Sequence, residues 1–225
     1  DVSSSAPTAG QVLKWSGSEW GPGTDASAAA GTVVIANQTD ATAYSPSEGD
    51  IVVVNAAVTF TQNLAGVTLI TDQNITLQNY TIERVNIHSS ATVTLDSNSG
   101  PGTFPHIKDC IIKANNIYID NTNRIQKCKL ECHSFSFLST YTMTGSSTQT
   151  GVEDSTIICT SLFTNGTASV RVKIDRSNIT TKQLQGSYNS IDSLITCYDG
   201  TSTSGGADVQ VNGTSYLNSV YAHPF

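Results

Sequence analysis

The distribution of apolar residues along the chain changes near residue 30. Beyond that point, short runs of β-branched residues alternate with polar turns, as in GTVVIA from residue 31, GDIVVVN from residue 49 and GVTLITDQNITL from residue 66. Apolar residues at helical spacing are absent from this region, and Gly, Asn, Asp and Ser separate the runs. Residues 31–225 are therefore predicted to form an all-β domain.

One six-residue pattern recurs within this region. It consists of an apolar residue, two polar residues, a small residue or cysteine, any residue, and a second apolar residue. Copies begin at Leu77, Ile107, Ile125, Val152, Ile174 and Val211, and a copy without the leading apolar residue begins at Ser190. The copies recur about every 22 residues on average, which suits one coil of a β-solenoid. We therefore expect a single-stranded, right-handed parallel β-helix whose longer intervals are loops.

The alternation of side chains along a strand assigns three columns of this pattern to the interior. They hold Cys110, Cys128, Ser155, Ser177 and Ser193, then Ile112, Leu130, Ile157, Ile179 and Ile195, then Ala114, Cys132, Cys159, Thr181 and Cys197. All five cysteines fall on these columns, which makes them small core residues. Disulfides between the stacked pairs are compatible with this arrangement but are not expected, because an odd number of cysteines without a CxxC pair favours reduced thiols.

A column of charged residues lies immediately before the small position of the pattern. Its members alternate in sign from coil to coil: Asp109, Lys127, Asp154, Arg176 and Asp192. Opposite charges one strand spacing apart attract, so the column is predicted to be a surface charge ladder that keeps neighbouring coils in register. Each exposed pair contributes only about 0–1 kcal/mol.

The same column contains the best candidates for catalytic carboxylates. Asp154 and Asp192 stand two coils apart, near the upper limit of the roughly 5–9.5 Å that separates the carboxyl groups of glycosidases. Arg176 lies between them and favours both carboxylates in the ionised form, which leaves no proton donor. The pair is therefore the best catalytic candidate, but the column is predicted to be structural. The histidines have no ligand spacing, so no metal or other cofactor is expected.

Three long intervals are predicted to be loops on one side of the solenoid: Ser89–Pro105, Phe137–Gly151 and Tyr198–Asp208. Loops on one face of a repeat protein form its usual binding surface. Tyr141 and Tyr198 offer flat amphipathic rings flanked by hydroxyl groups, and are the predicted contacts for a glycan receptor.

Composition narrows the functional classes. Ser, Thr and Asn number 28, 30 and 16, whereas only 13% of the residues are charged. The net charge of −7 gives no electrostatic basis for nucleic-acid binding. The most apolar stretch, around residues 51–60, is too short and too polar to insert into a membrane. Asn-x-Thr sequons at Asn37, Asn74, Asn79, Asn165, Asn178 and Asn212 leave open a secreted, glycan-binding solenoid, although unpaired cysteines argue against it.

Residues 1–30 differ from the rest and contain both tryptophans, Trp15 and Trp20. QVLKW and the residues around Trp20 predict a β-hairpin with a turn at residues 16–18. This segment resembles a short module of bacteriophage tail fibres and other virion appendages with the pattern PxxGQVLxWdGsxWxPxtd. The matching positions are Pro7, Gly10, Gln11, Val12, Leu13, Trp15, Gly17, Ser18, Trp20, Pro22, Thr24 and Asp25.

The resemblance covers about a tenth of the chain and implies a place on a virion. We therefore expect a non-enzymatic virion protein, a tail fibre or spike or a head fibre or decoration protein. Residues 1–30 would attach it to other virion proteins, and residues 31–225 would form a β-helix that contacts host-surface polysaccharide. Fibres of this kind imply a homotrimer assembled in the host cytoplasm. The enzymatic alternative is a polysaccharide-degrading tailspike, a glycoside hydrolase or lyase.

Overall fold

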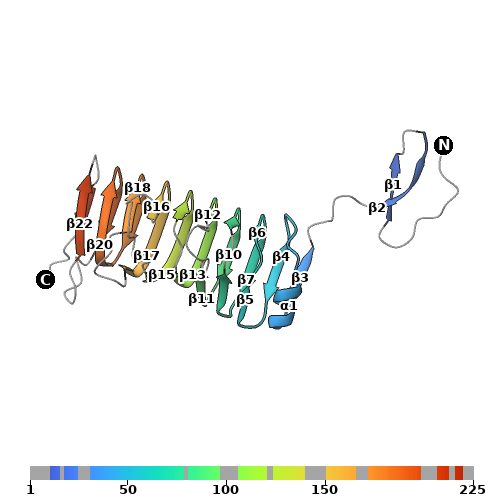
Figure 1. Cartoon of the computed structure of the whole chain (residues 1–225), viewed down its shortest axis with the longest axis horizontal. Helices are drawn as coiled ribbons and strands as arrows, with labels where there is room; N and C mark the ends of the chain where they lie inside the picture. The colour runs from blue at the N-terminus through green and yellow to red at the C-terminus, as the bar shows by residue number, and fades with distance from the viewer. Residues whose placement is uncertain are drawn as a thin grey trace.

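The computed structural model describes residues 11–15, 18–24, 31–78, 81–96, 106–120, 124–139, 151–165, 172–198, 207–212 and 216–219. Strands dominate these ranges, which contain one short helix, α1 (Gln38–Ala43). Figure 1 shows the strands from β3 onward stacked as successive coils along the long axis. The predicted all-β class is confirmed.

The N-terminal segment forms an antiparallel hairpin of β1 (Gln11–Trp15) and β2 (Trp20–Thr24). Trp15 pairs with Trp20 at its closed end. These two strands form a sheet of their own, separate from the sheet that joins the other 21 strands. The predicted hairpin is confirmed, whereas Ser16 and Gly17 of its predicted turn lie outside the described residues.

The remaining strands wind into a parallel β-solenoid of about seven turns, as predicted. A coil contributes to up to three stacked sheets, which we call the first, second and third faces in chain order. The first face contains β6 (Leu64–Ala65), β9 (Ile82–Glu83), β12 (His106–Lys108), β14 (Arg124–Gln126), β16 (Gly151–Glu153), β18 (Val172–Asp175), the C-terminal part of β20 (Gln183–Ile191) and β22 (Ala207–Asn212).

The second and third faces share three long strands, which turn the corner between them. The second face contains β3 (Thr32–Ile35), β4 (Ile51–Val54), β7 (Thr68–Thr71), β10 (Asn86–Ser89), the N-terminal halves of β13 (Ile111–Asp120), β15 (Lys129–Ser139) and β17 (Thr156–Asn165), β19 (Asn178–Thr181), β21 (Leu194–Cys197) and β23 (Tyr216–Ser219). The third face contains β5 (Val58–Phe60), β8 (Ile75–Gln78), β11 (Thr92–Asp96), the C-terminal halves of β13, β15 and β17, and the N-terminal part of β20.

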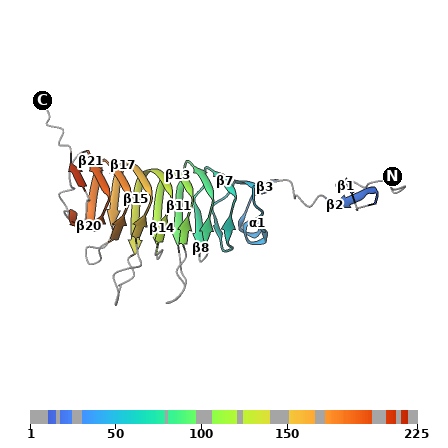
Figure 2. The same cartoon turned by 90° about the horizontal axis from the view of Figure 1, so that it is seen from above.

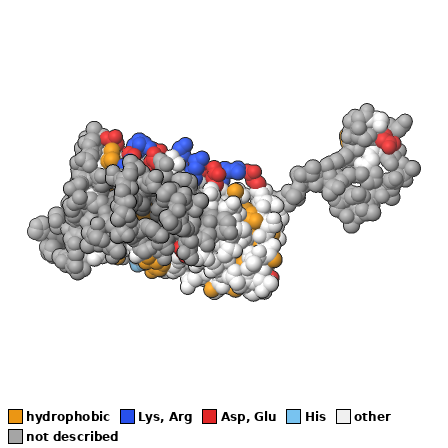
Figure 3. Space-filling model, in the orientation of Figure 1, with side chains coloured by type: hydrophobic (Ala, Val, Ile, Leu, Met, Phe, Trp, Pro, Cys, Tyr) orange, Lys and Arg blue, Asp and Glu red, His pale blue; other side chains and the backbone are white. Residues whose placement is uncertain are grey.

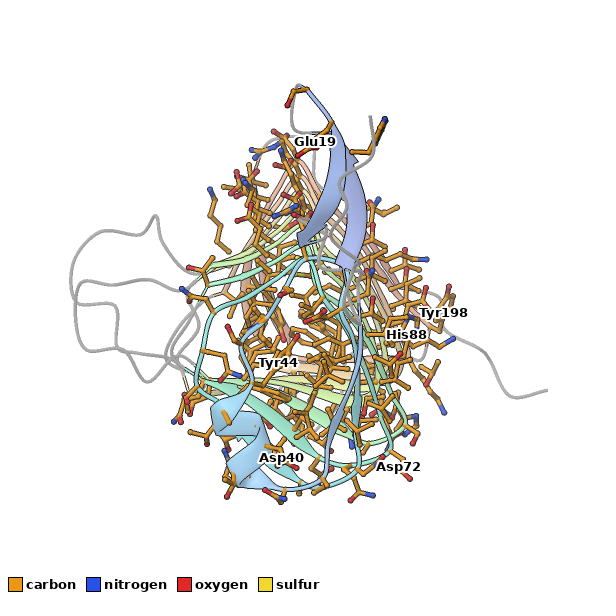
Figure 4. The ribbon with its side chains drawn as sticks, turned by 90° about the vertical axis from the view of Figure 1, so that its right-hand side faces the viewer. Glu19, Asp40, Tyr44, Asp72, His88 and Tyr198 are labelled. Atoms are coloured by element: carbon orange, nitrogen blue, oxygen red, sulfur yellow. The ribbon has the colours of Figure 1, made fainter. Side chains whose placement is uncertain are left out.

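Every pairing between coils is parallel, so equivalent residues of successive coils lie directly above one another (Figure 2). Seen along the axis, the coils superimpose as a three-sided outline, with His88 and Tyr198 along one side (Figure 4). A stacked outline of this kind places each column of the sequence pattern on a fixed line along the molecule.

At the N-terminal end of the solenoid, α1 packs against β5 and β3. Asn37 caps the helix, because its Oδ1 accepts a hydrogen bond of 3.1 Å from the backbone N–H of Asp40. Ala41 is buried, and its carbonyl accepts a 2.9 Å hydrogen bond from Nε2 of Gln62 in the next coil. The helix therefore closes the apolar interior that the terminal coil would otherwise expose.

The buried carboxylate of Asp50 lies at the same end of the solenoid. Asp50 Oδ2 accepts hydrogen bonds from the Tyr44 hydroxyl at 2.9 Å and the Ser47 backbone N–H at 3.0 Å, and Oδ1 accepts one from the Gly31 N–H at 3.4 Å. Burial opposes ionisation of Asp50, but the hydrogen bonds outweigh it and lower the pKa of the carboxyl below its ordinary value. Burial, reinforced by Asp50, raises the pKa of Tyr44. Figure 4 shows Tyr44 pointing into the outline.

The structure corrects the first copy of the six-residue pattern. Leu77 lies in β8 on the third face, whereas Ile82 pairs with Ile107 and so holds the leading position of its coil. The true copy runs over residues 82–87, and an earlier one runs over residues 64–69. Sequence matching missed both because Val85 and Val67 replace the small residue.

The three predicted interior columns are buried. In the first of them, serine hydroxyls link one coil to the next. Ser177 Oγ accepts a 3.1 Å hydrogen bond from the Ser155 N–H and donates one of 2.7 Å to the Asp175 carbonyl, and Ser193 repeats both contacts one coil further on. The small polar residues therefore satisfy backbone groups inside a narrow core.

The cysteines occupy the same columns as free thiols. Cys128 Sγ donates to the Gln126 carbonyl at 3.2 Å, in the manner of the serines. Cys132 Sγ and Cys159 Sγ are 3.6 Å apart, and their contact, together with burial, raises the pKa of Cys159. A raised pKa keeps this thiol protonated and poorly reactive.

Aromatic side chains fill the core behind the third face. Phe135 and Phe163 stack with ring centroids 5.1 Å apart, and Phe137 packs edge-on against both. Tyr188 extends the group, with its ring centroid 5.4 Å from that of Phe163. This cluster gives the third face a rigid backing in the middle and later coils.

Candidate functional site

The predicted charge ladder lies on the corner between the first and second faces. Its residues share a left-handed backbone with φ between 46° and 55°, and Arg84 precedes them in the same position: Arg84, Asp109, Lys127, Asp154, Arg176 and Asp192. We call this line the charged edge. In an earlier coil the corner is Gly66, with φ of 67°. A left-handed conformation costs a non-glycine residue about 1–2 kcal/mol.

The left-handed turns aim backbone N–H groups of the charged edge along the solenoid axis. The N–H of Asp109 donates to the Gln126 carbonyl at 3.1 Å, that of Lys127 to the Glu153 carbonyl at 3.0 Å, and that of Arg176 to the Ile191 carbonyl at 3.0 Å. The turn thus continues the ladder of hydrogen bonds between coils around the corner. Its conformation is fixed by the fold and not by the charge of the side chain.

Ion pairs run along this edge, and Figure 3 shows acidic and basic atoms following one another along the top of the solenoid. Arg84 bonds Glu48 at 2.5 Å, and Lys108 lies 3.4 Å from Glu83. Arg176 forms the largest group, with Asp154 at 2.7 Å, Asp175 at 3.1 Å and Glu153. Within the described part of the chain, Lys127 makes no ion pair, so the alternation is only partly used for pairing.

The best catalytic candidates, Asp154 and Asp192, both lie on the charged edge. Arg176 holds both carboxylate oxygens of Asp154, through Nε at 2.7 Å and an Nη at 3.1 Å. The hydrogen bond to Asp154 is the main reason that the pKa of Arg176 is raised. A bidentate guanidinium stabilises the ionised carboxylate, and this arrangement suits an ion pair better than an acid catalyst.

The two predicted glycan contacts fall on different parts of the molecule. Tyr141 lies outside the described residues. Tyr198 directly follows β21 on the second face, where its side chain is 50% exposed and its N–H donates to the Thr181 carbonyl at 3.1 Å.

The predicted loops also need correction. The interval Ser89–Pro105 contains β11, so the long connection there is residues 97–105, between β11 and β12. The first two intervals leave from strands of the third face, whereas Tyr198–Asp208 follows a strand of the second face. The intervals therefore do not all leave from the same part of the coil, because the third comes one strand earlier in its coil.

The outer surface of the third face was missed by the sequence analysis. Its central column is uncharged and rich in hydroxyl groups: Thr59, Thr76, Thr94, Tyr118, Ser136, Thr164 and Gln185. A parallel column two residues earlier holds Asn74, Thr92, Asn116, Ser134, Leu162 and Gln183. We call these two columns the hydroxyl face. The signal was present as Thr-x-Thr and Ser-x-Ser in residues 92–94 and 134–136.

The second face carries an exposed apolar group at its N-terminal end. Val34 is 55% exposed, Ile51 and Ile70 are each 43% exposed, and the half-buried Val53 lies between Val34 and Ile70 in register. We call these four residues the apolar patch. Contiguous exposed apolar side chains of this kind mark association surfaces more often than isolated ones do.

Other chemistries find no support in the described ranges. No group of three or more His, Cys, Asp or Glu side chains there is arranged to hold a metal ion. No helix in those ranges has the length and apolar character required to span a membrane.

At the N-terminal hairpin, the Trp20 side chain is 47% exposed. An exposed indole on a two-stranded sheet offers a large apolar contact to a partner.

Comparison with protein-family models, curated proteins and solved structures finds no significant match for this chain.

Proposed function

We propose that the protein is a non-enzymatic structural component of a bacteriophage particle, a tail fibre or spike or a head fibre or decoration protein. The observation that carries this proposal is the GQVLKWSGSEW segment, which resembles a virion module and whose flanking strands pair with each other in a separate two-stranded sheet. A two-stranded hairpin is marginal alone and needs a partner surface. In this proposal residues 1–30 attach to other virion proteins, and the solenoid contacts host-surface polysaccharide.

The charged edge supports a structural role for the solenoid. The most acidic part of the edge is tied together by Arg176, which contacts Glu153, Asp154 and Asp175. A glycosidase needs one protonated and one ionised carboxyl group, and a guanidinium among carboxylates opposes protonation. We therefore propose that this cluster is an ion-pair network that holds coils in register.

We further propose that the protein assembles as a homotrimer through the apolar patch. The members of the apolar patch adjoin one another, whereas the comparably exposed Ile111 of the same face lies between Asn86 and Lys129 in register. In multi-angle light scattering at micromolar concentration, the protein should have the mass of a trimer. Ile51→Lys with Ile70→Glu should give monomers, and Thr156→Lys, elsewhere on the same face, should leave the trimer intact. A wild-type monomer contradicts this part of the proposal.

Virion location is tested by labelling. Particles from cells that produce the protein are imaged with gold-conjugated antibody, and gold should decorate an appendage or the head of each particle. A Trp20→Ala variant should fold normally and lose the label, whereas Tyr198→Ala should keep it. Absence of label on particles while the protein is secreted into the medium would instead support the secreted, glycan-binding solenoid.

The depolymerase alternative has its own assay. Host capsule or lipopolysaccharide is incubated with the protein, and new reducing ends, or new unsaturated ends for a lyase, are measured. We expect none. Release that disappears in both Asp154→Asn and Asp192→Asn would replace the structural proposal with an enzymatic one.

A further inference from the structure

We propose that the hydroxyl face binds an extended, uncharged polysaccharide, with the Tyr118 ring as the stacking platform at its centre. This inference rests on the proposed function, because it names the site and the ligand class of the glycan contact. It differs from the prediction made from sequence, which places that contact at Tyr141 and Tyr198.

The surface of the hydroxyl face is polar but uncharged. The described strand segments that pair within the third face contain no Lys, Arg or His, and their acidic residues, Asp96 and Asp120, stand at strand ends. Hydroxyl and amide groups both donate and accept hydrogen bonds, as sugar hydroxyls do. Anionic polymers require cationic partners, which this face does not supply.

The polar groups of the hydroxyl face repeat regularly from coil to coil. Thr94, Tyr118 and Ser136 occupy the same register position in three successive coils. Neighbouring strands are about 4.8 Å apart, so the face presents polar groups at a constant spacing along the solenoid. A linear polymer lying along the axis meets the same groups repeatedly, and weak contacts add through multivalency.

Tyr118 is the aromatic residue of the central column. Its neighbours in the strand, Ile117 and Ile119, are buried, so the ring projects outward and is half-buried between the adjacent columns. Among the described residues, no group forms a hydrogen bond with its hydroxyl. An aromatic ring with a free polar tip stacks on the apolar side of a sugar ring while the tip bonds a hydroxyl.

The hydroxyl face is held rigidly around Tyr118. Asn116 Nδ2 donates a 3.3 Å hydrogen bond to Thr92 Oγ1, which fixes neighbouring members of the outer columns. The stacked Phe135 and Phe163 lie behind the strands next to Tyr118. Because the platform is already ordered, binding loses little conformational entropy.

The hydroxyl-face site is tested by measuring binding of the full chain to a printed array of bacterial polysaccharides that includes neutral and anionic members. The strongest neutral polysaccharide is then cut to soluble oligosaccharides for isothermal titration calorimetry. We expect selective binding to neutral members. Tyr118→Ala should weaken affinity about tenfold, and Tyr118→Phe about two- to threefold. Tyr198→Ala is the matched control, a tyrosine on another face, and should bind like wild type.

Folding is monitored by circular dichroism, and Thr94→Lys supplies a second variant on the same column in case Tyr118→Ala unfolds. It too should weaken binding. Wild-type affinity in Tyr118→Ala and Thr94→Lys, or binding lost only in Tyr198→Ala, overturns the hydroxyl-face site. Binding to anionic members alone, or to none, also overturns it. Gold labelling of virions is independent of all these variants, so a labelled particle with no neutral-glycan binding refutes this inference and leaves the virion proposal standing.

Discussion

The charged edge and the hydroxyl face both run along the solenoid and both repeat once per coil, yet they differ in how the backbone treats their side chains. On the edge, six non-glycine residues sit in left-handed turns with φ of 46–55°. On the hydroxyl face, the residues lie in ordinary strands backed by aromatic rings. The edge therefore carries strain for which only some of the charges compensate, whereas the face is unstrained and leaves its polar groups for a ligand.

The largest expected effect comes from comparing a core residue behind the hydroxyl face with a residue of the charged edge. Phe163→Ala should lower the free energy of unfolding by about 3–5 kcal/mol, because it removes a buried ring that packs against Phe135 and Tyr188. Arg176→Ala on the edge should cost much less, because the Arg176 side chain is 48% exposed and solvent weakens its ion pairs. Urea denaturation of both variants measures the difference. Equal losses would mean that the edge is a principal source of stability.

A smaller effect is expected directly beneath the edge. Ser177→Ala leaves the Ser155 N–H without its buried acceptor, and should lower the free energy of unfolding by about 1–3 kcal/mol. Ser177→Cys is the matched control, since Cys128 occupies the same column and makes the equivalent contact with a carbonyl. It should lose clearly less than Ser177→Ala in the same urea experiment. An equal loss in the two variants would show that packing and not hydrogen bonding sets the effect.

The pH dependence of stability should come from Asp50, the buried carboxylate at the N-terminal end of the solenoid. The pKa of Asp50 is lowered in the folded protein, so its contribution to stability is present above the unfolded pKa and disappears as pH falls through the folded value. Thermal unfolding should therefore shift to lower temperature as the pH is lowered below about 4. Asp50→Asn should reduce this shift, and Asp72→Asn, an exposed control, should not. An unchanged shift in Asp50→Asn would assign the acid sensitivity to other carboxylates.

The smallest effect tests the strain of the edge itself. Lys127→Gly should raise the free energy of unfolding by up to about 1 kcal/mol, because glycine accepts φ of 53° without strain and Lys127 makes no ion pair with a described residue. Arg176→Gly relieves the same strain but loses its ion pairs with Asp154 and Asp175, so it should gain less. Chemical denaturation of both variants at low and at high salt distinguishes the relief of backbone strain from the loss of ion pairs. A loss in Lys127→Gly would show that its side chain stabilises the corner.

Much of the fold could be predicted from the spacing of apolar residues. The interior columns through Ile112 and Leu130 are buried as expected, because a period of two on a strand leaves no other face for them. The prediction that a copy begins at Leu77 was wrong. Leu77 and Ile82 are both apolar, and only the pairing of Ile82 with Ile107 shows which of them holds the first position of the pattern.

The candidate sites were less predictable. Each residue of the charged edge holds the same position in the six-residue pattern, so the edge could be predicted from the sequence. The hydroxyl face depends on Thr94, Tyr118 and Ser136, which are far apart in the chain and become neighbours only through the parallel register. Thr and Ser are also abundant everywhere in this sequence, so their presence at those positions carried no signal by itself.

By itself, the sequence determined the all-β class, the repeat, the small polar and thiol-lined interior and the hairpin at Trp15 and Trp20. These follow from periodicity and from turn chemistry, which act over a few residues. The tertiary structure decided the register of the early coils, the left-handed backbone beneath each charge of the edge and the continuity of the hydroxyl face. Those features arise because each coil aligns on the one before it through hydrogen bonds between residues far apart in sequence, and local spacing contains no information about that alignment.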